Sequence, residues 1–349
     1  MNVTVKLVDR SYDVVLGNGA RNELRKLLAF RVPNAKMAVI VTSPALARQP
    51  WFDVTSGLDQ HVVEVPEGED AKNFSALEGL CEQFAQLQLS RHDVIVAVGG
   101  GAITDLGGFA AAVYLRGIAV VHIPTSLVGQ VDAAIGGKTG INLRAGKNLV
   151  GAFHQPVGVL CDFDVLATLP ERERLSGLGE VAKCWLLEGR RAPEIRTASQ
   201  SELVTMSVQL KANIVSGDER EAGQRALLNY GHTLAHAVES LALARSVDDM
   251  RHGEAVAIGL AFAVRLARRL GRVGDDDVAN HDAVLKALGL VSALPPTYAT
   301  HELLAAMSHD KKAHHDLTFV LAGPQGFEVV RDVEPTVVAE VLESFRGES

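Results

Sequence analysis

The sequence has few cysteines, no excess of basic residues and no long apolar run, and each shortage excludes a class of protein. Cys81, Cys161 and Cys184 are the only cysteines among 349 residues; they are odd in number and widely spaced. Reduced thiols in a cytoplasmic protein fit this pattern better than a disulfide framework or a cysteine metal site. The formal net charge of -8 argues against nucleic acid as the main partner, because a phosphate backbone requires a basic surface.

The sequence also lacks the signals of a membrane or exported protein. No apolar run approaches the roughly 20 residues of a membrane-spanning helix, and the N-terminus lacks the basic-then-apolar pattern of a signal peptide. A membrane partner is therefore not expected. The length exceeds the usual limit of a single core, so we expect two domains, at residues 1–165 and 166–349.

The two predicted domains differ in their patterns. Residues 1–165 open with a hairpin at 3–16 and then alternate strands at 37–41, 61–65, 94–98 and 118–123 with helices at 22–30, 74–87 and 104–115. Repeated strand–helix units indicate a Rossmann-like α/β domain with a parallel sheet. Residues 166–349 indicate a mainly α-helical domain, with helices at 171–187, 201–229, 232–244, 254–270 and 278–288, a hairpin at 317–330 and a closing helix after Pro335.

The most informative stretch is VVHIPTSLVGQVDAAIGGKTGINLRAGKNLVGAFHQP, residues 120–156, which follows a buried strand. Its glycines let the backbone approach a ligand, and Lys138 and Lys147, with amides and hydroxyls nearby, suit phosphate or carboxylate oxygens. A glycine-rich surface loop with incidental lysines is the alternative. The number of polar groups after a buried strand favours a binding loop.

A second stretch, VAVGGGAITDLGGF, runs from a strand through Gly99–Gly101 into a helix. Glycines at this point let a pyrophosphate approach the backbone, and the helix N-terminus offers free N–H groups. An ordinary strand–helix turn with Asp105 as a capping acid explains the same pattern. Upstream, PEGEDAK places Glu69 and Lys72 in a polar turn.

The helical half carries a possible metal site. Glu180 and Lys183 are three residues apart and His232 and His236 are four apart, so each pair shares one helical face. His252 begins another predicted helix. One glutamate and two histidines on separate helices can hold a divalent ion with a position open for substrate. A histidine pair of this spacing is also common on ordinary polar helix faces.

Taken together, these motifs closely resemble those of the 3-dehydroquinate synthase family of sugar-phosphate cyclases, over nearly the whole chain. The resemblance implies conversion of 3-deoxy-D-arabino-heptulosonate 7-phosphate, a small phosphorylated sugar acid, to 3-dehydroquinate and phosphate. It implies NAD and a divalent metal as cofactors, with transient oxidation, elimination, reduction and aldol closure as the steps.

The resemblance also implies a set of site residues. The metal, Zn²⁺ or Co²⁺, is assigned to Glu180, His232 and His252. The cofactor positions are Glu69, Lys72, Gly100, Gly101, Ala102, Asp105, Thr125, Ser126, Leu127, Asp132, Lys138, Lys147, Thr168, Leu169 and Glu173. The substrate positions are Asp132, Lys138, Asn148, Lys183, Lys211, Arg225, Asn229, His236, Lys311, Lys312 and Arg116. Catalytic roles are expected for Lys138, Asn148, Lys183, Arg225 and His236. Arg116 matches a family arginine that reaches the neighbouring subunit's site, which implies a homodimer.

Two departures from the family pattern leave alternatives open. Ser43 and Ala45 stand where the family usually has an Asp and an Asn at the adenosine end of NAD. The segment KCWLLEGRRAPEIRT, with LNYGHTLAHAVE and FVLAGPQG, looks more like the aminodehydroquinate synthases of ansamycin-type antibiotic pathways, which act on the 4-amino analogue. More distant alternatives are a metal-dependent polyol dehydrogenase, which would not need the phosphate-binding lysines, and a non-enzymatic dinucleotide-binding protein.

Overall fold

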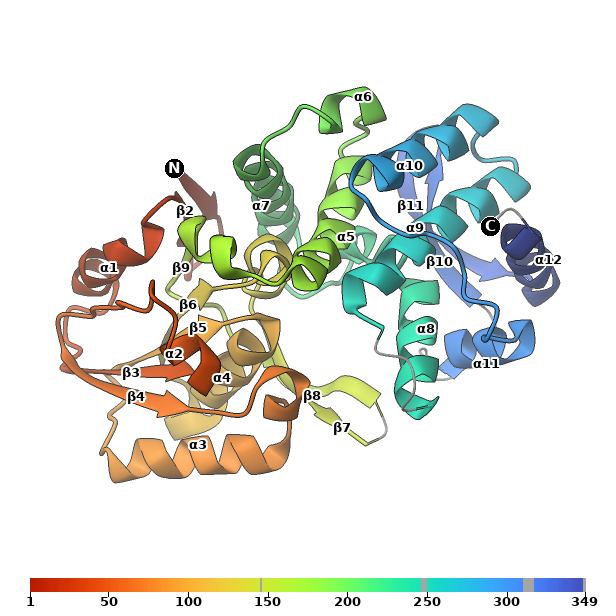
Figure 1. Ribbon diagram of the computed structural model, residues 1–349. Helices are drawn as coiled ribbons and strands as arrows, with labels where there is room; N and C mark the ends of the chain where they lie inside the picture. The colour runs from red at the N-terminus through yellow and green to blue at the C-terminus, as the bar shows by residue number, and fades with distance from the viewer. Residues whose placement is uncertain (145, 246–249, 310–316, 348–349) are drawn as a thin grey trace. The chain divides into compact units, whose positions relative to one another are not determined.

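The protein is described by a computed structural model of residues 1–349, except 145, 246–249, 310–316 and 348–349 (Figure 1). The chain divides into two compact units. The first comprises Met1–Pro170 and Ser207–Arg220, and the second comprises Glu171–Met206 and Glu221–Ser349. The inclusion of Ser207–Arg220 in the first unit was not indicated by any sequence pattern. No helix in the described part of the chain is long and apolar enough to cross a membrane.

The first unit is built on a seven-stranded sheet with the order β1-β2-β9-β6-β5-β3-β4. The opening hairpin pairs antiparallel, and every other pairing in this sheet is parallel. The predicted Rossmann-like fold is therefore confirmed. The strands are β1 (Asn2–Val5), β2 (Tyr12–Gly17), β3 (Met37–Thr42), β4 (Asp59–Glu64), β5 (Val94–Gly99), β6 (Ala119–Pro124) and β9 (Gly158–Asp162), of which β9 was not predicted.

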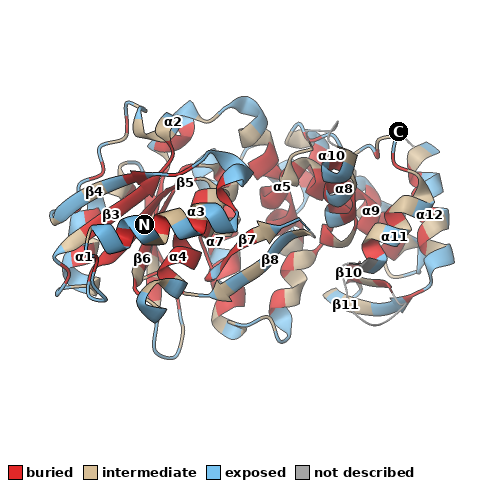
Figure 2. Ribbon diagram, turned by 90° about the horizontal axis from the view of Figure 1, so that it is seen from below, coloured by how far each residue is buried: buried red, intermediate tan, exposed pale blue. Residues whose placement is uncertain are grey.

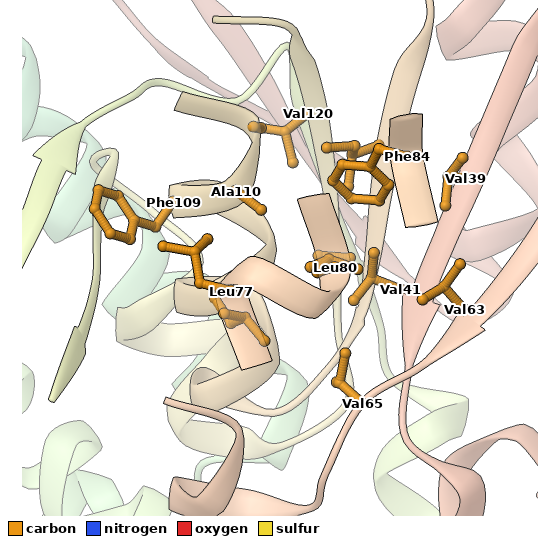
Figure 3. Close-up of a cluster of buried hydrophobic side chains, with 14 of the residues drawn as sticks. Val39, Val41, Val63, Val65, Leu77, Leu80, Phe84, Phe109, Ala110 and Val120 are labelled. Carbon is orange, nitrogen blue, oxygen red and sulfur yellow. The ribbon is translucent and has the colours of Figure 1, made fainter. Parts of the chain in front are cut away.

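Helices cover the sheet because its central strands are apolar on both faces. In β3, Val39 and Val41 join one buried cluster and Ala38 and Ile40 join the other, as expected for a strand buried on both sides. Leu80 and Phe84 pack into the first cluster (Figure 3). The helices are α1 (Leu24–Arg31), α2 (Pro44–Ala47), α3 (Phe74–Gln86) and α4 (Gly101–Val113), with short turns η1 (Ala20–Glu23), η2 (Gly68–Ala71), η3 (Tyr114–Arg116) and η5 (Asp164–Thr168).

The stretch after β6 that we interpreted as a binding loop contains regular secondary structure, so the prediction of a loop was wrong. A short π-helix, η4 (Gly129–Ala133), is followed by the antiparallel hairpin of β7 (Lys138–Leu143) and β8 (Gly146–Phe153). Glycines inside strands weaken the alternating pattern by which a strand is recognised. Lys138 and Lys147 thus lie at the starts of two paired strands.

The second unit is mainly helical, as predicted. Helix α9 (His252–Arg269) is its most buried element, because residue 253 and all of residues 255–267 are buried (Figure 2). A hairpin of β10 (Leu317–Gly323) and β11 (Gly326–Val333) and the closing helix α12 (Pro335–Gly347) confirm the predicted C-terminal pattern. The other helices are α5 (Glu171–Leu187), α6 (Ala192–Ile195), α8 (His232–Arg245), α9 (His252–Arg269), α10 (Asp275–Ala287) and α11 (Thr300–His309).

The predicted single helix over 201–229 was wrong. Helix α7 (Gln200–Gly217) ends well before the 3-10 helix η6 (Gln224–Asn229). Between them Glu221 has φ of 61°, in the left-handed region that a continuous α-helix does not use. The break coincides with the change from the first unit to the second at Arg220 and Glu221.

The buried His122 in β6 makes the stability of the fold depend on pH. Its side chain is 2% exposed, and Nδ1 has no hydrogen-bond partner among the described residues. Burial, reinforced by the nearby His154, lowers the pKa of His122 to about 3. Because an unfolded histidine has a pKa of about 6.5, the stability linked to the neutral ring is complete above that pH and is lost as the pH falls toward 3.

We therefore expect His122 to account for a loss of about 2 kcal/mol in the unfolding free energy between pH 7.5 and pH 5. Urea unfolding of the parent and of His122→Gln, which cannot titrate, measures this loss. The variant should lose about that much less than the parent over the same interval. Equal losses in the two proteins would contradict the assignment.

Candidate metal and cofactor sites

Three helices of the second unit bring Glu180, His232 and His252 together. Glu180 lies in α5, and the two histidines are the first residues of α8 and α9. Glu180 Oε1 is 3.3 Å from His232 Nε2 and 3.1 Å from His252 Nε2, and one ligand atom from each residue lies within 4.8 Å of the others. Two ligands of a tetrahedral zinc ion, each about 2.0–2.1 Å from the metal, are about 3.3 Å apart. The spacing fits one divalent ion with a fourth position left open.

Glu180 is held as a carboxylate by its neighbours. Its side chain is 1% exposed, and Lys183, one turn further along α5, forms an ion pair with Oε2. Burial alone would raise the pKa of Glu180, but Lys183 and His232 outweigh burial and hold the pKa well below its ordinary value. Lys183 therefore occupies one carboxylate oxygen and leaves Oε1 facing the histidines.

The two histidines have different partners on their second ring nitrogen. His232 Nδ1 is 3.1 Å from the carbonyl oxygen of Tyr230, and His252 Nδ1 is 3.2 Å from Glu239 Oε2. If each Nδ1 carries the proton and donates it, each Nε2 lone pair faces Glu180. In both rings the nitrogen nearer to Glu180 is then the one that can coordinate a metal.

The electrostatics of this cluster favour an added positive charge. Burial would lower the pKa of His252, but its hydrogen bonds to Glu180 and Glu239 outweigh burial and raise the pKa to about 10. Burial lowers the pKa of His232, and Lys183 adds to that effect. A site that favours a cation between two carboxylates and keeps one imidazole neutral has the donor chemistry of a divalent metal site.

Each of these ligands adjoins a glycine at a close backbone contact. A Cβ added to Gly253 would lie 1.6 Å from the carbonyl oxygen of Ser176, and one added to Gly179 would lie 2.3 Å from the carbonyl oxygen of Gly253. The backbone N–H of Gly253 also donates to Ser176 Oγ, at 3.1 Å. Gly231, with φ of 78°, packs in the same way against the backbone of α9. The helices can approach this closely only because these positions carry no side chain.

In the first unit, Lys72 joins three of the predicted cofactor-side segments. Its buried Nζ donates to Asp105 Oδ2 and to Asn148 Oδ1, both at 2.5 Å. Asn142 of β7 donates to Glu69 Oε2 at 2.5 Å. Burial raises the pKa of Asp105 to about 6, against the opposing effect of Lys72. These contacts tie η2 and the N-terminal half of α4 to the β7–β8 hairpin.

The carboxyl ends of β5 and β6 lie side by side, with Gly99 paired to Pro124. Gly100 and Gly101 therefore begin α4 beside the segment Thr125–Leu127, which follows β6. This edge of a parallel sheet, with the free N–H groups of a helix N-terminus, is where a dinucleotide pyrophosphate binds in this class of fold. Close by in sequence, the side-chain and backbone oxygens of Asp132 accept from Lys211 Nζ at 2.5 and 2.7 Å.

The remaining predicted residues are less closely grouped. Lys138, Lys147, Arg116 and Thr168 are exposed, and Leu169 is half-buried after η5. In the second unit Asn229 donates a hydrogen bond to Glu221, and Arg225 is buried. Glu173 forms an ion pair with Arg251. His236 is exposed, and its ring centroid lies 5.3 Å from that of His232. Ala102 lies in the first turn of α4, whereas Lys311 and Lys312 lie outside the described residues.

Sequence reasoning missed Glu239 and the glycine contacts. Glu239 follows His232 by seven residues, which is two helical turns, so a search along one face of α8 could have found it. The glycines beside Glu180, His232 and His252 were visible in the sequence. Their contacts join separate helices, however, and no local pattern reports such a contact.

Gly253→Ala should separate the metal ligands. The new methyl group would overlap the carbonyl oxygen of Ser176, so α9 has to shift away from α5 and move His252 relative to Glu180. We expect a loss of about 1–3 kcal/mol in unfolding free energy from overpacking, and Zn²⁺ binding at least about tenfold weaker. Calorimetric titration of the metal-free protein with Zn²⁺ measures the affinity.

The matched control is Gly79→Ala, because Gly79 lies in α3 of the first unit, and the added Cβ has no described atom within 4 Å other than those of its own helix backbone and adjacent residues. That variant should bind Zn²⁺ as the parent does. Parental affinity in Gly253→Ala would show that the glycine contact does not position the ligands.

The chain matches known proteins along most of its length. Residues 62–176 match the family model "3-dehydroquinate synthase N-terminal", and residues 177–313 match "3-dehydroquinate synthase C-terminal". A protein of Amycolatopsis mediterranei (strain S699), named "Putative aminodehydroquinate synthase", is 49% identical over 99% of this chain and 95% of its own length. A 3-dehydroquinate synthase of Arthrobacter sp. (strain FB24) is 42% identical, over 91% of this chain and 89% of its own length.

Two solved structures share the fold of this chain. The 2-deoxy-scyllo-inosose synthase complexed with carbaglucose-6-phosphate, NAD⁺ and Co²⁺ shares the fold, with a TM-score of 0.84, 24% identity and coverage of 99% of this chain and 100% of that one. The 2-epi-5-epi-valiolone synthase from Streptomyces hygroscopicus subsp. jinggangensis 5008, with NAD⁺ and Zn²⁺ bound, has a TM-score of 0.81 and is 26% identical over 98% of this chain and 99% of its own. From the two family models and the two relatives, we conclude that this chain belongs to the 3-dehydroquinate synthase family.

Proposed function

We propose that this chain is a NAD- and metal-dependent lyase of the 3-dehydroquinate synthase type. Its reaction would convert 3-deoxy-D-arabino-heptulosonate 7-phosphate into 3-dehydroquinate and inorganic phosphate. The observation that carries the proposal is the Glu180, His232 and His252 cluster, found in a chain of this family at the spacing of a three-ligand zinc site. Family membership also favours the cyclase over a polyol dehydrogenase.

The second unit would hold the metal. Glu180, His232 and His252 supply one oxygen and two nitrogens, and the bound ion, Zn²⁺ or Co²⁺, would supply a Lewis acid for the substrate's hydroxyl and carbonyl oxygens. Lys183 keeps Glu180 ionised by pairing with Oε2. The exposed His236, one turn after His232, would transfer a proton beside this centre or contact the phosphate.

The first unit would bind NAD. The N–H groups at Gly100, Gly101 and Ala102 suit the pyrophosphate, and Lys72 fixes Asp105 and Asn148 beside them. The remaining proposed cofactor contacts are Glu69, Thr125, Ser126, Leu127, Asp132, Lys138, Lys147, Thr168, Leu169 and Glu173. The cofactor ends the cycle in its starting redox state, so no NADH accumulates.

The two anionic groups of the substrate need cations. Lys138 and Lys147 lie exposed on the hairpin that follows η4 and suit the phosphate. Lys183, Lys211 and Arg225, with Lys312, are our candidates for the carboxylate. Asn148, Asn229 and Lys311 complete the proposed substrate contacts. Lys211 is already paired with Asp132, which fixes its Nζ before substrate binds.

The 4-amino analogue of the heptulosonate is the second candidate substrate. The Amycolatopsis mediterranei relative named for the amino activity is 49% identical, compared with 42% for the Arthrobacter 3-dehydroquinate synthase. The stretch KCWLLEGRRAPEIRT, which suggested this branch, forms the end of α5 and the turn into α6. There the indole of the buried Trp185 donates to the carbonyl oxygen of Arg191 at 3.2 Å.

We also propose that the enzyme is a cytoplasmic homodimer in which Arg116 reaches the active site of the partner subunit. Val113 and Leu115 beside it are 44% and 40% exposed, which suits a contact surface, and the three cysteines form no disulfide. Light scattering after size exclusion should give twice the chain mass. A stable monomer that retains full activity would contradict the dimer.

Phosphate release tests the proposed reaction. With NAD and Zn²⁺, the parent should liberate one phosphate per heptulosonate 7-phosphate with no net gain in absorbance at 340 nm. His232→Ala should lower turnover by at least about 100-fold, because it removes a ligand of the stabilising ion. His301→Ala, at an exposed histidine of α11, is the control and should retain parental turnover.

The same assay with the 4-amino heptulosonate distinguishes the two substrates. The quantity compared is kcat/KM for the amino compound divided by kcat/KM for the oxygen compound. A ratio above one for the amino compound would assign the chain to the amino branch. Accumulation of NADH without release of phosphate would contradict both readings and indicate a dehydrogenase.

A further inference from the structure

Glu239 is a buried carboxylate of α8 to which the proposed reaction gives no role. Its side chain is 7% exposed. Its Oε2 lies 3.2 Å from His252 Nδ1, while Nε2 of the same ring lies 3.1 Å from Glu180 Oε1. His252 is therefore held at both ring nitrogens by carboxylates from two different helices.

The two histidines therefore differ in the group that contacts Nδ1. The Nδ1 partner of His232 is the neutral carbonyl of Tyr230, whereas that of His252 is a buried charge. A carboxylate that accepts from Nδ1 fixes the ring's tautomer and orientation and increases the electron density on Nε2. His252 is the first residue of α9, so no preceding helical turn packs against its ring. The ring is therefore held less firmly than it would be inside a helix.

We propose that Glu239 is a positioning residue of the metal centre, which aligns His252 Nε2 with Glu180 Oε1 and strengthens the imidazole as a ligand. The inference rests on the proposed metal site and deepens it. Glu239 itself does not coordinate the ion or touch the substrate. It lies on the same face of α8 as His232, two turns further along, so one helix supplies both a ligand and the support for a second ligand.

Metal affinity, measured apart from activity, tests the proposal. Glu239→Gln keeps the shape of the side chain and removes its charge. Competition between the metal-free protein and a chromophoric chelator should show Zn²⁺ binding about 10- to 100-fold weaker than in the parent. The visible absorption of the Co²⁺-loaded variant should change in band position or intensity, because the His252 ligand is altered. Glu239→Ala should bind Zn²⁺ at least as weakly as Glu239→Gln.

Glu302→Gln is the matched control. Glu302 also pairs with a residue of α8, Arg245, but at the far end of the helix from His232. That variant should keep the parental Zn²⁺ affinity and Co²⁺ spectrum even if its melting temperature falls.

Parental Zn²⁺ affinity and Co²⁺ spectrum in Glu239→Gln would overturn the inference, and a lower melting temperature with unchanged metal binding would assign Glu239 to the fold alone. The proposed function fails separately. If the parent binds neither Zn²⁺ nor Co²⁺, the metal site itself is wrong and this inference falls with it. If the parent binds the ion and releases phosphate while Glu239→Gln binds metal equally well, only the role of Glu239 is lost.

Discussion

Close packing of backbone against backbone at Gly179, Gly231 and Gly253 is the constraint on which the proposed metal centre depends. Each glycine adjoins one of the three ligands, and a Cβ at any of them would overlap backbone atoms of a neighbouring helix. The ligand positions are thus set by contacts between main-chain atoms, which, unlike side chains, have no alternative rotamers. A zinc site requires donor atoms about 2.0–2.2 Å from the ion, so a small shift of one helix is enough to lose a ligand. Rigid contacts beside each ligand meet that requirement.

The charges of the centre explain why such costly groups are buried. An isolated buried carboxylate is strongly unfavourable, yet Glu180 and Glu239 are both almost fully enclosed. Lys183 pairs with one of them, and the ring of His252 lies between the two carboxylates, where a further positive charge is favourable. A divalent ion would supply that charge without occupying the imidazole nitrogen with a proton. The negative charge of the two buried carboxylates therefore favours the binding of a metal ion.

Sequence patterns predicted the elements whose signals are local. The apolar runs at 94–98 and 118–123 became β5 and β6, and the helix at 171–187 matches α5 in full. Strand β9 escaped notice because its five residues follow Pro156 closely and include a glycine. The β7–β8 hairpin was hidden by its glycines, and good helix formers on both sides concealed the break after Gly217.

In the candidate site, too, sequence patterns predicted the individual residues but not the contacts between separate elements. The spacing left a metal site open, the family resemblance assigned it to Glu180, His232 and His252, and the structure places these three residues together. The contact between Glu239 and His252 and the glycine contacts were not predicted, because they join residues of different helices. Lys72 was expected near the cofactor. Its bridge from Asp105 to Asn148 follows from the folding of the hairpin against η2 and α4, which no sequence spacing reveals.

The most direct test is to locate the ion. Crystals grown with Zn²⁺ and measured on both sides of the zinc absorption edge would give its position by anomalous scattering. We expect one site per chain, bound by Glu180 Oε1, His232 Nε2 and His252 Nε2 at about 2.0–2.2 Å, with a water or substrate oxygen as the fourth ligand. An ion held by other residues, or no ion at these three side chains at saturating Zn²⁺, would contradict it.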